Sequence, residues 1–313
     1  MTAPAPRPLP SAQSLETVIA RAGEIVLGKT HVLRLAFACL LARGHLLIED
    51  LPGVGKTTLA QVLARVLGLH FKRIQFTNDL LPADILGISI YQADSREFSF
   101  HPGPIFSQVL LADEINRATP KTQSALLEAM EEHQVTVDGV AHRLPEPFYV
   151  IATQNPHHLV GTFPLPESQL DRFLMRLELG YPDHQAEREL LKGRDRRELL
   201  EALAPALDGK ALLAWQARVV EIHAADALLD YVQALVEATR RSADFSEGLS
   251  PRAAMAWLRA ARAWALLSGR QMVLPDDVQA VAVPVIAHRL RPAKSGEPRA
   301  ALVERLIRSV PIP

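Results

Sequence analysis

Residues 45–58 read HLLIEDLPGVGKTT, an apolar run followed by a glycine-rich turn and a lysine-threonine pair. This order is typical of a strand that enters a phosphate-binding loop, which then continues into a helix. The general pattern has a glycine five positions before Gly55, where this chain has Asp50. An ordinary glycine turn before a helix therefore stays open as the alternative. The apolar strand before the turn and the helical periodicity over 56–67 favour the phosphate loop.

Each part of this loop has a chemical role in the prediction. Glycines allow backbone N–H groups to turn inward around phosphate oxygens, and the helix that follows directs its positive N-terminus toward the same oxygens. The ammonium group of Lys56 would offset the charge of the β- and γ-phosphates, and the hydroxyl of Thr57 would bind Mg²⁺. We therefore expect ATP to be held by six adjacent residues: Gly53, Val54, Gly55, Lys56, Thr57 and Thr58.

A second motif consists of two adjacent acids, Asp113 and Glu114, directly after the apolar run at 109–112. A carboxylate at the end of a buried strand needs a partner, because an unpaired buried charge is costly. Beside a phosphate loop that partner can be Mg²⁺, which Asp113 would hold through water. Glu114 would then act as the general base on the attacking water. Taken alone, the pair could equally be an exposed cap of the next helix.

A polar residue also follows the next predicted strand, at 148–153. From the end of that neighbouring strand, Asn155 could reach the γ-phosphate or the attacking water, and we predict this role for it. The structural alternative is a turn asparagine before Pro156, which is common.

Apolar runs that suit buried strands alternate with helical segments through the first half of the chain. This alternation predicts an α/β fold in which helices cover both faces of a parallel five-stranded sheet. Strands are expected at 45–49, 71–76, 109–112, 148–153 and 174–179, and helices at 15–25, 30–43, 56–67, 119–133 and 166–173.

Two stretches interrupt this alternation. Residues 88–106 contain the stretch SREFSFHPGPIF, which alternates with period two and has two prolines, and this predicts an inserted strand pair after a short helix at 83–86. Residues 134–144 place Asp138-Gly139 between β-branched runs. This dipeptide predicts a two-residue hairpin turn, because both of its central residues need positive φ.

Near residue 182 the strand signals nearly disappear, which predicts a second domain. We expect a disordered leader at 1–14, an α/β core at 15–182 and an all-helical lid at 183–313. Helices are predicted in the lid at 185–192, 209–220, 225–240, 251–267, 276–288 and 299–309.

The composition excludes some classes of function. With 34 basic and 35 acidic residues, the net charge of -1 argues against a protein that coats nucleic acid. The single cysteine, Cys39, can form neither an internal disulfide nor a cysteine zinc site, and we expect it to be a buried apolar residue. Its apolar run, 35–42, is too short for the roughly 20 residues that cross a bilayer. We therefore expect no transmembrane segment and a cytoplasmic protein.

Four blocks of the sequence resemble the signature motifs of MoxR family AAA+ ATPases. They are Glu49–Thr57, Ala112–Ala118, Ala152–Pro156 and Leu165–Phe173. The resemblance extends over about residues 25–305 and accommodates Asp50. It implies an αβα P-loop core followed by a helical lid, and it implies that the stretches at 88–106 and 134–144 face the pore of a ring.

The resemblance also assigns roles to arginines. Arg172, just before the fifth strand, matches the arginine finger, whose guanidinium would act on the ATP of the neighbouring subunit. Arg176 is the second candidate for that role. Arg252, at the start of a long lid helix, matches a second sensor that reaches back to the γ-phosphate. For Arg172 the structural alternative is a salt bridge to Asp171 or another acid, and for Arg252 it is a solvated helix start.

Together these features predict a Mg²⁺-dependent ATPase that forms a homo-oligomeric ring, expected to be hexameric. By resemblance it would remodel protein clients or help to insert metal cofactors, in some cases with a partner that carries a von Willebrand A domain. A magnesium-chelatase-like subunit, a nucleic-acid motor and a nucleotide-gated scaffold are the alternatives. The near-neutral charge makes binding to nucleic acid unexpected.

Structural interpretations are favoured for several other residues. His157 and His158 have no further ligands at suitable spacing, so a polar surface loop is expected there rather than a metal site. Three tryptophans lie at helical positions in the predicted lid and are expected to pack in its core: Trp215, Trp257 and Trp264.

Overall fold

The computed structural model describes residues 12–94, 96–155, 161–193, 196–294 and 296–312. Its centre is a five-stranded, fully parallel sheet in the order β2-β5-β8-β1-β9. The bounds are β1 Leu46–Glu49, β2 Phe71–Gln75, β5 Val109–Asp113, β8 Tyr149–Gln154 and β9 Met175–Leu177. The predicted fold class is therefore confirmed.

Both faces of this sheet are buried, because apolar side chains alternate between two separate cores. In β5, Val109 and Leu111 belong to one core, while Leu110 and Ala112 belong to the other. β1 and β8 divide their side chains in the same way. This explains why the strands appear in the sequence as continuous apolar runs rather than as an alternating pattern.

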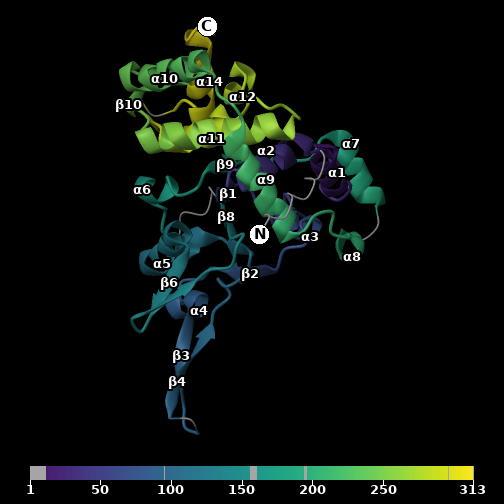
Figure 1. Cartoon of the computed structure of the whole chain (residues 1–313), viewed down its shortest axis with the longest axis vertical. Helices are drawn as coiled ribbons and strands as arrows, with labels where there is room; N and C mark the ends of the chain where they lie inside the picture. The colour runs from purple at the N-terminus through teal and green to yellow at the C-terminus, as the bar shows by residue number, and fades with distance from the viewer. Residues whose placement is uncertain (1–11, 95, 156–160, 194–195, 295, 313) are drawn as a thin grey trace, which may run out of the picture.

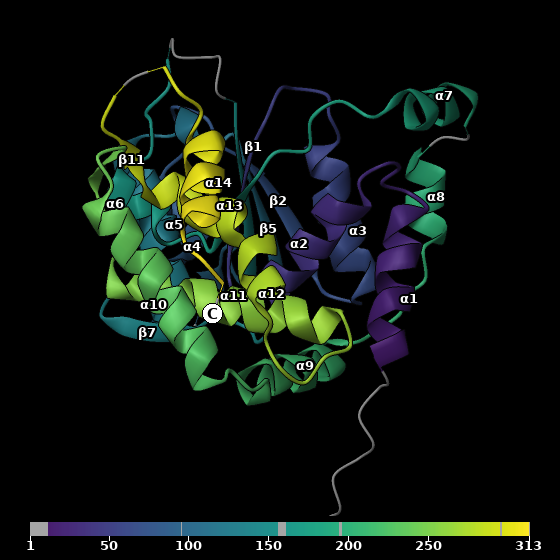
Figure 2. The ribbon, with the colours of Figure 1, turned by 90° about the horizontal axis from the view of Figure 1, so that it is seen from above.

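Helices cover the two faces unequally (Figure 2). On one face lie α1 Ala12–Gly23, α2 Thr30–Leu41 and α3 Lys56–Val66. On the other face lie the shorter α4 Pro82–Leu86 and the longer α5 Pro120–Glu132. A single turn of 3₁₀-helix, η1 Ile115–Arg117, connects β5 to α5, and α6 Glu167–Leu170 precedes β9.

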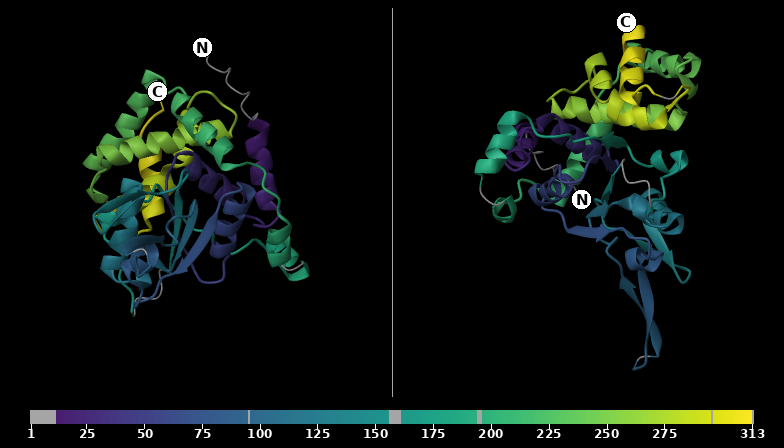
Figure 3. Two further views of the ribbon diagram at one scale, coloured as in Figure 1. Left: turned by 60° about the horizontal axis from the view of Figure 1, so that its bottom comes forward. Right: turned by 180° about the vertical axis from the view of Figure 1, so that it is seen from behind.

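The two predicted insertions are hairpins. β3 Gly87–Gln92 pairs with β4 Glu97–Pro102, and this hairpin projects far from the body of the molecule (Figures 1 and 3). β6 Gln134–Val137 pairs with β7 Val140–Arg143 around the turn Asp138-Gly139. Both turn residues have positive φ, 51° and 80°, as the sequence predicted.

The second half of the chain is mostly helical and lies against the first (Figure 1). It consists of α7 His184–Lys192, α8 Arg196–Ala202, α9 Gly209–Glu221, α10 Asp226–Arg241, α11 Pro251–Leu267, α12 Pro275–Ala280, α13 Ala282–Ile286, η2 Ala287–Arg289 and α14 Arg299–Ser309. One apolar core runs from α1–α3 into α9–α14. Gln216 reinforces this contact by donating a hydrogen bond to the carbonyl of Leu40 at 2.8 Å. No described helix combines the length and apolarity that crossing a bilayer requires.

Four expectations need correction. The predicted leader included residues 12–14, which belong to α1, while residues 1–11 lie outside the described part. The lid is not purely helical, because β10 Phe245–Glu247 pairs with β11 Arg291–Pro292. The helix predicted at 276–288 is divided near Val281, and Pro284 cannot donate the backbone bond that would continue it. Finally, α8 lies where no helix was predicted.

The aromatic and cysteine predictions can be checked by burial. Trp215 and Trp257 are fully buried, and Trp257 donates its indole N–H to the carbonyl of Val278 at 2.8 Å. Trp264 is half-buried beside His31. Cys39 is buried, and desolvation raises the pKa of its thiol to about 12, so it stays neutral.

Candidate functional site

The phosphate loop lies between the carboxyl end of β1 and the first turn of α3, as the sequence predicted. Gly53 and Gly55 have φ values of 84° and 98°, which residues with a Cβ rarely adopt. Nothing lies within 4 Å of a Cβ built on either glycine. The two positions therefore need glycine because of their backbone conformation, and not because a side chain would clash with a neighbour. Val54, Thr57 and Thr58 are half-buried around the same turn.

Asp50, which departs from the general loop pattern, has a structural role. One carboxylate oxygen accepts a hydrogen bond from the N–H of Leu51 at 2.7 Å. The other accepts from the N–H groups of Leu179 and Gly180, both at 2.6 Å. Since Leu179 and Gly180 follow β9, Asp50 joins the loop to the segment that leaves the sheet.

Lys56 points back into its own loop. Its Nζ donates to the carbonyl oxygens of Asp50 at 2.5 Å and Leu51 at 3.2 Å. Burial lowers the pKa of Lys56, although the negative charges of Asp50, Asp113 and Glu114 oppose this shift. The two carbonyls therefore hold the ammonium group inside the loop, close to its own backbone.

The two acids lie at the carboxyl end of β5, on the same edge of the sheet as the loop. Asp113 is buried, and its carboxylate accepts from the hydroxyl of Thr153 at 2.5 Å and from Arg73 at 2.7 Å. Glu114 has a positive φ of 57° and accepts from Gln75 at 3.0 Å, while Arg117 binds the same oxygen at 2.8 Å. Glu114 thus stands in a sparsely populated backbone conformation, which is frequent at functional sites.

Four of these partners were not predicted from the sequence: Arg73, Gln75, Arg117 and Thr153. The first two lie on β2, which pairs with β5 so that Gln75 is opposite Asp113. No local motif marks them, because the pairing of β2 with β5 is not encoded in either strand. Arg73 also donates to Gln75 at 3.0 Å, so a continuous polar chain connects both acids.

The residues at this edge fit the chemistry of a magnesium ion. The Thr57 hydroxyl and the Asp113 carboxylate are hard oxygen donors of the kind that Mg²⁺ prefers, and Mg²⁺ usually retains water and phosphate oxygens as its other ligands. No group of three or more histidines, cysteines or acids suited to a metal occurs among the described residues. Asn155 is buried directly after β8, the strand between β5 and β1. His157 and His158 lie outside the described residues.

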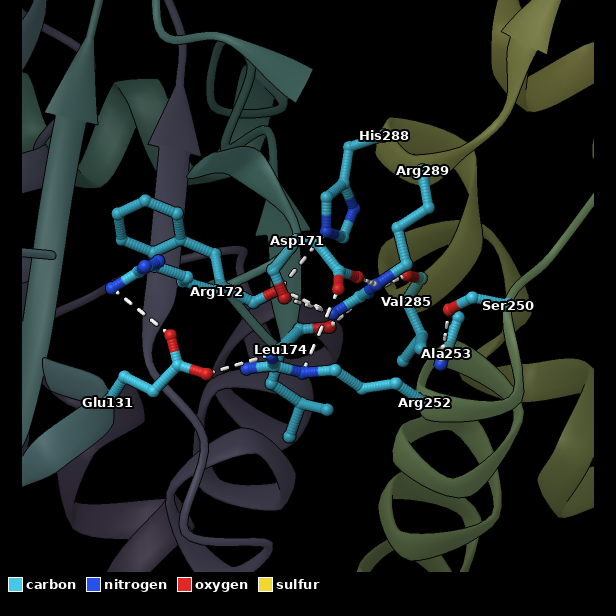
Figure 4. Close-up of polar contacts among 11 residues, drawn as sticks. Glu131, Asp171, Arg172, Leu174, Ser250, Arg252, Ala253, Val285, His288 and Arg289 are labelled. Atoms are coloured by element: carbon cyan, nitrogen blue, oxygen red, sulfur yellow. Dashed lines mark hydrogen bonds and ion pairs between the residues drawn. The ribbon is translucent and has the colours of Figure 1, made fainter. Parts of the chain in front are cut away.

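Two of the three predicted arginines, Arg172 and Arg252, lie together at another place, between the core and the lid (Figure 4). Arg172 donates to the carbonyl of Leu127 at 2.6 Å and pairs with Glu131 at 3.1 Å. Arg252 reaches from the start of α11 to the other oxygen of Glu131 at 2.8 Å. The same arginine lies 3.7 Å from Asp171, which is bound more closely by Arg289 at 2.6 Å.

This cluster lies at the sheet edge opposite the phosphate loop. β9 runs parallel to β1 with Met175 opposite Leu46, and the N–H of Leu174 donates to the carbonyl of His45 at 2.9 Å. Arg172 therefore lies at the amino end of β1, while the loop follows its carboxyl end. The four residues of β1 alone separate the two edges by roughly 10 Å.

Arg252 lies away from the phosphate loop of its own chain. We expected it to reach back to the γ-phosphate, but the structure brings it to Arg172 and Glu131 and not to Lys56. The physical reason is the packing of α11 on α2, which leaves Arg252, in the first turn of α11, against Glu131 at the end of α5. Arg176, the second finger candidate, pairs with Glu49 at 3.0 Å on the neighbouring strand.

Replacing Asp50 with alanine tests its structural role. The change removes the acceptor of three backbone N–H groups, two of which belong to the segment after β9. A hydrogen bond to a charged group stabilises a fold by about 1.5–3 kcal/mol, but three bonds to one carboxylate do not add fully, because water can bind part of the freed N–H groups. Asp50→Ala should therefore lower the free energy of unfolding by roughly 2–5 kcal/mol. Urea unfolding followed by circular dichroism measures it. Asp50→Asn, which retains one acceptor oxygen, should lose less, and equal losses in both variants would contradict this role.

Comparisons with known proteins agree with this architecture. Residues 45–175 match the family model described as "ATPase family associated with various cellular activities (AAA)", and residues 237–306 match the AAA lid domain. A crystal structure from Cytophaga hutchinsonii, described as an inferred ATPase, superposes with a TM-score of 0.89 at 35% identity and covers 96% of both chains.

The relatives give the family its name. An uncharacterized protein, YeaC of Bacillus subtilis, is 46% identical over 92% of each chain. Chaperone MoxR1 of Mycobacterium tuberculosis is 41% identical, covering 88% of this chain and 75% of the relative. Protein MoxR of Paracoccus denitrificans is 35% identical, covering 92% and 93%. With its phosphate loop, its paired acids and its lid, this chain belongs to the MoxR family of AAA+ proteins and is an ATPase.

Proposed function

We propose that the chain hydrolyses ATP with Mg²⁺ in a homo-oligomeric ring, expected to be hexameric, and that it uses this hydrolysis to remodel protein clients. Lys56 and the loop N–H groups bind the phosphates, and Thr57 and Asp113 hold the ion, which offsets phosphate charge when bound. Glu114 takes the proton of the attacking water, which Asn155 helps to orient.

One observation in particular supports the proposed ring. Arg172 and Arg252 lie together at the sheet edge opposite the loop of their own chain. This position is far from the phosphate loop of the same chain and suits contact with a nucleotide bound by another copy. Arg172 and Arg252 share Glu131, and we infer that each exchanges a carboxylate oxygen for a phosphate oxygen when a neighbour docks.

The projecting hairpin β3–β4 supports a protein client. Two of its aromatic side chains, Tyr91 and Phe98, pair with ring centroids 5.4 Å apart near its tip and are 54% and 74% exposed. Ile88 and Ile90 on the same hairpin are also exposed. Apolar side chains grouped on a projecting element are typical of protein-binding surfaces. Help with the insertion of metal cofactors, and a partner protein that carries a von Willebrand A domain, also belong to this proposal.

Steady-state phosphate release at increasing protein concentration tests the ring. Since each site needs an arginine from a second copy, activity per chain should rise with concentration and reach a plateau where light scattering detects the hexamer. Chelation of Mg²⁺ should abolish the release of phosphate. Activity per chain that is constant from monomer to assembly would contradict the proposed ring.

The proposed action on protein clients needs a separate test. Prevention of the aggregation of a heat-unfolded model protein, measured with and without ATP, provides it. DNA-stimulated and salt-dependent turnover would favour the nucleic-acid motor instead.

A further inference from the structure

A cavity of about 580 Å³ lies between the core and the helical second half. The core contributes the turn between α2 and β1, the end of α5 and the residues before β9, while the second half contributes α9, α11 and Arg289. The cluster of Figure 4 forms one of its walls. Because its walls come from both halves of the chain, anything bound in it would contact the core and the lid together.

The cavity carries a strong excess of positive charge. Six arginines and two carboxylates line it, which leaves a formal excess of four positive charges: Arg43, Arg172, Arg252, Arg259, Arg262 and Arg289 against Glu131 and Asp171. His45, another lining residue, adds no charge at neutral pH, because burial lowers its pKa to about 4. Like charges around one cavity produce a positive potential that attracts anions.

Both carboxylates are already occupied. Glu131 binds Arg172 and Arg252, and Asp171 binds Arg289. The ATP hydrolysis proposed above uses two of the six arginines and leaves the others without a function.

The side chains of three arginines of the cavity have no hydrogen-bond or ion-pair partner within the described part of the chain: Arg43, Arg259 and Arg262. The buried Nε of Arg262 makes no hydrogen bond. Desolvation lowers the pKa of Arg259, and the positive charges of Arg252 and Arg43 lower it further. An unpartnered buried donor and mutually repelling guanidinium groups both destabilise the folded chain unless an anion joins them.

The arrangement on α11 is regular. Arg252, Arg259 and Arg262 are separated by seven and three residues, which places them along one face of the helix. Met255 lies on the same face, and Val219 and Val220 of α9 line the cavity with it. The cavity therefore combines a row of guanidinium donors with an apolar wall.

We propose that the part of this cavity lined by Arg43, Arg259 and Arg262, which the hydrolysis proposed above does not use, is a second ligand site, separate from the phosphate loop, for a small molecule that carries a di- or triphosphate group. Guanidinium groups bind phosphate through two parallel N–H···O bonds, so a row of them suits adjacent phosphates. The volume is within the roughly 300–1,000 Å³ of small-molecule sites, and the apolar wall would contact the uncharged part of the ligand. Such a ligand would bridge α11 to the core and hold the lid in the arrangement seen here.

Titration of inorganic tripolyphosphate into the Lys56→Ala variant by isothermal calorimetry tests this site. In that variant the phosphate loops of all copies are impaired, so binding reports on another location. We expect one tripolyphosphate per chain. Adding Arg259→Glu should weaken binding by at least about tenfold, because one charge-assisted contact becomes a repulsion. Affinity should also fall as salt is added.

The matched control is Arg241→Glu in the same background. Arg241 has an 80% exposed side chain, pairs only with Glu237 on α10 among the described residues and does not line the cavity, so the same change in charge should alter affinity by no more than about twofold. Circular dichroism verifies that each variant is folded. Arg43→Asn is a second variant of a lining arginine, at an exposed position where the substitution should not disturb the fold, and it should also weaken the binding of tripolyphosphate.

Two results would overturn the proposal. Equal affinities with and without Arg259→Glu in the Lys56→Ala background would show that these arginines do not bind the anion. Absence of binding to the Lys56→Ala variant, with Arg259→Glu still lowering ATP turnover in the parental assembly, would mean that the arginines serve the nucleotide of a neighbouring copy. The second result would leave the proposed ring intact.

Discussion

Replacing Glu114 with glutamine should reduce steady-state ATP hydrolysis by at least about 100-fold while ATP remains bound. Glutamine preserves the shape of the side chain and its contact with Gln75, but its neutral amide cannot take a proton from water. The positive φ of residue 114 is accessible to both side chains to a similar degree, so the backbone should not rearrange. Phosphate release measures turnover, and equilibrium binding of a fluorescent ATP analogue measures affinity.

The control for this experiment is Lys56→Ala, which should lose binding as well as turnover. Comparison of the two variants separates the effect on the chemical step from the effect on phosphate binding. Turnover of Glu114→Gln at the parental rate would show that the carboxylate is not the base. Loss of binding in that variant would instead show that Glu114 shapes the nucleotide site.

Replacing Arg172 with alanine should lower turnover in the assembled protein by about 10³-fold or more, which is the usual contribution of an arginine that stabilises a phosphoryl-transfer transition state. ATP binding to the variant should change little, because Arg172 lies at the sheet edge opposite the phosphate loop of its own chain. Arg172→Lys should recover little activity, since an ammonium group lacks the planar pair of donors.

Mixing two inactive variants distinguishes action on a neighbour from action on the same chain. In a mixed ring of Arg172→Ala and Lys56→Ala chains, an intact site forms wherever the loop of the first meets the arginine of the second. Turnover should therefore reappear on mixing, with a maximum near equal proportions. A mixture as inactive as its components, although light scattering shows mixed assembly, would contradict a role in the neighbouring site. Size-exclusion chromatography verifies that neither substitution disrupts assembly through the contact with Glu131.

The local parts of the candidate site were predictable because short stretches of sequence determine them. Positive φ at Gly53 and Gly55 follows from the lack of a Cβ, and the acids at the end of β5 follow from an apolar run that stops at Asp113. The bounds of α11 were predicted correctly for a similar reason, since the side chain of Ser250 accepts from the N–H of Ala253 before Pro251 continues into the helix.

Elements that depend on few residues or on distant partners were not predictable in this way. The strand pair β10–β11 has three and two residues, which is too short for any periodicity to be visible. The contacts of Arg73 and Gln75 with the two acids exist because β2 is the neighbour of β5, and strand order is a property of the whole sheet.

The sequence by itself determined that this chain has a phosphate loop, a pair of acids beside it and an α/β core followed by helices. Only the tertiary structure decided that Arg252 joins Arg172 at Glu131, and that further arginines of α11 face a cavity against the core. The physical reason is the range of the forces involved. Backbone conformation and strand burial are set by neighbouring residues, whereas the place that a long charged side chain reaches is set by how two distant helices pack.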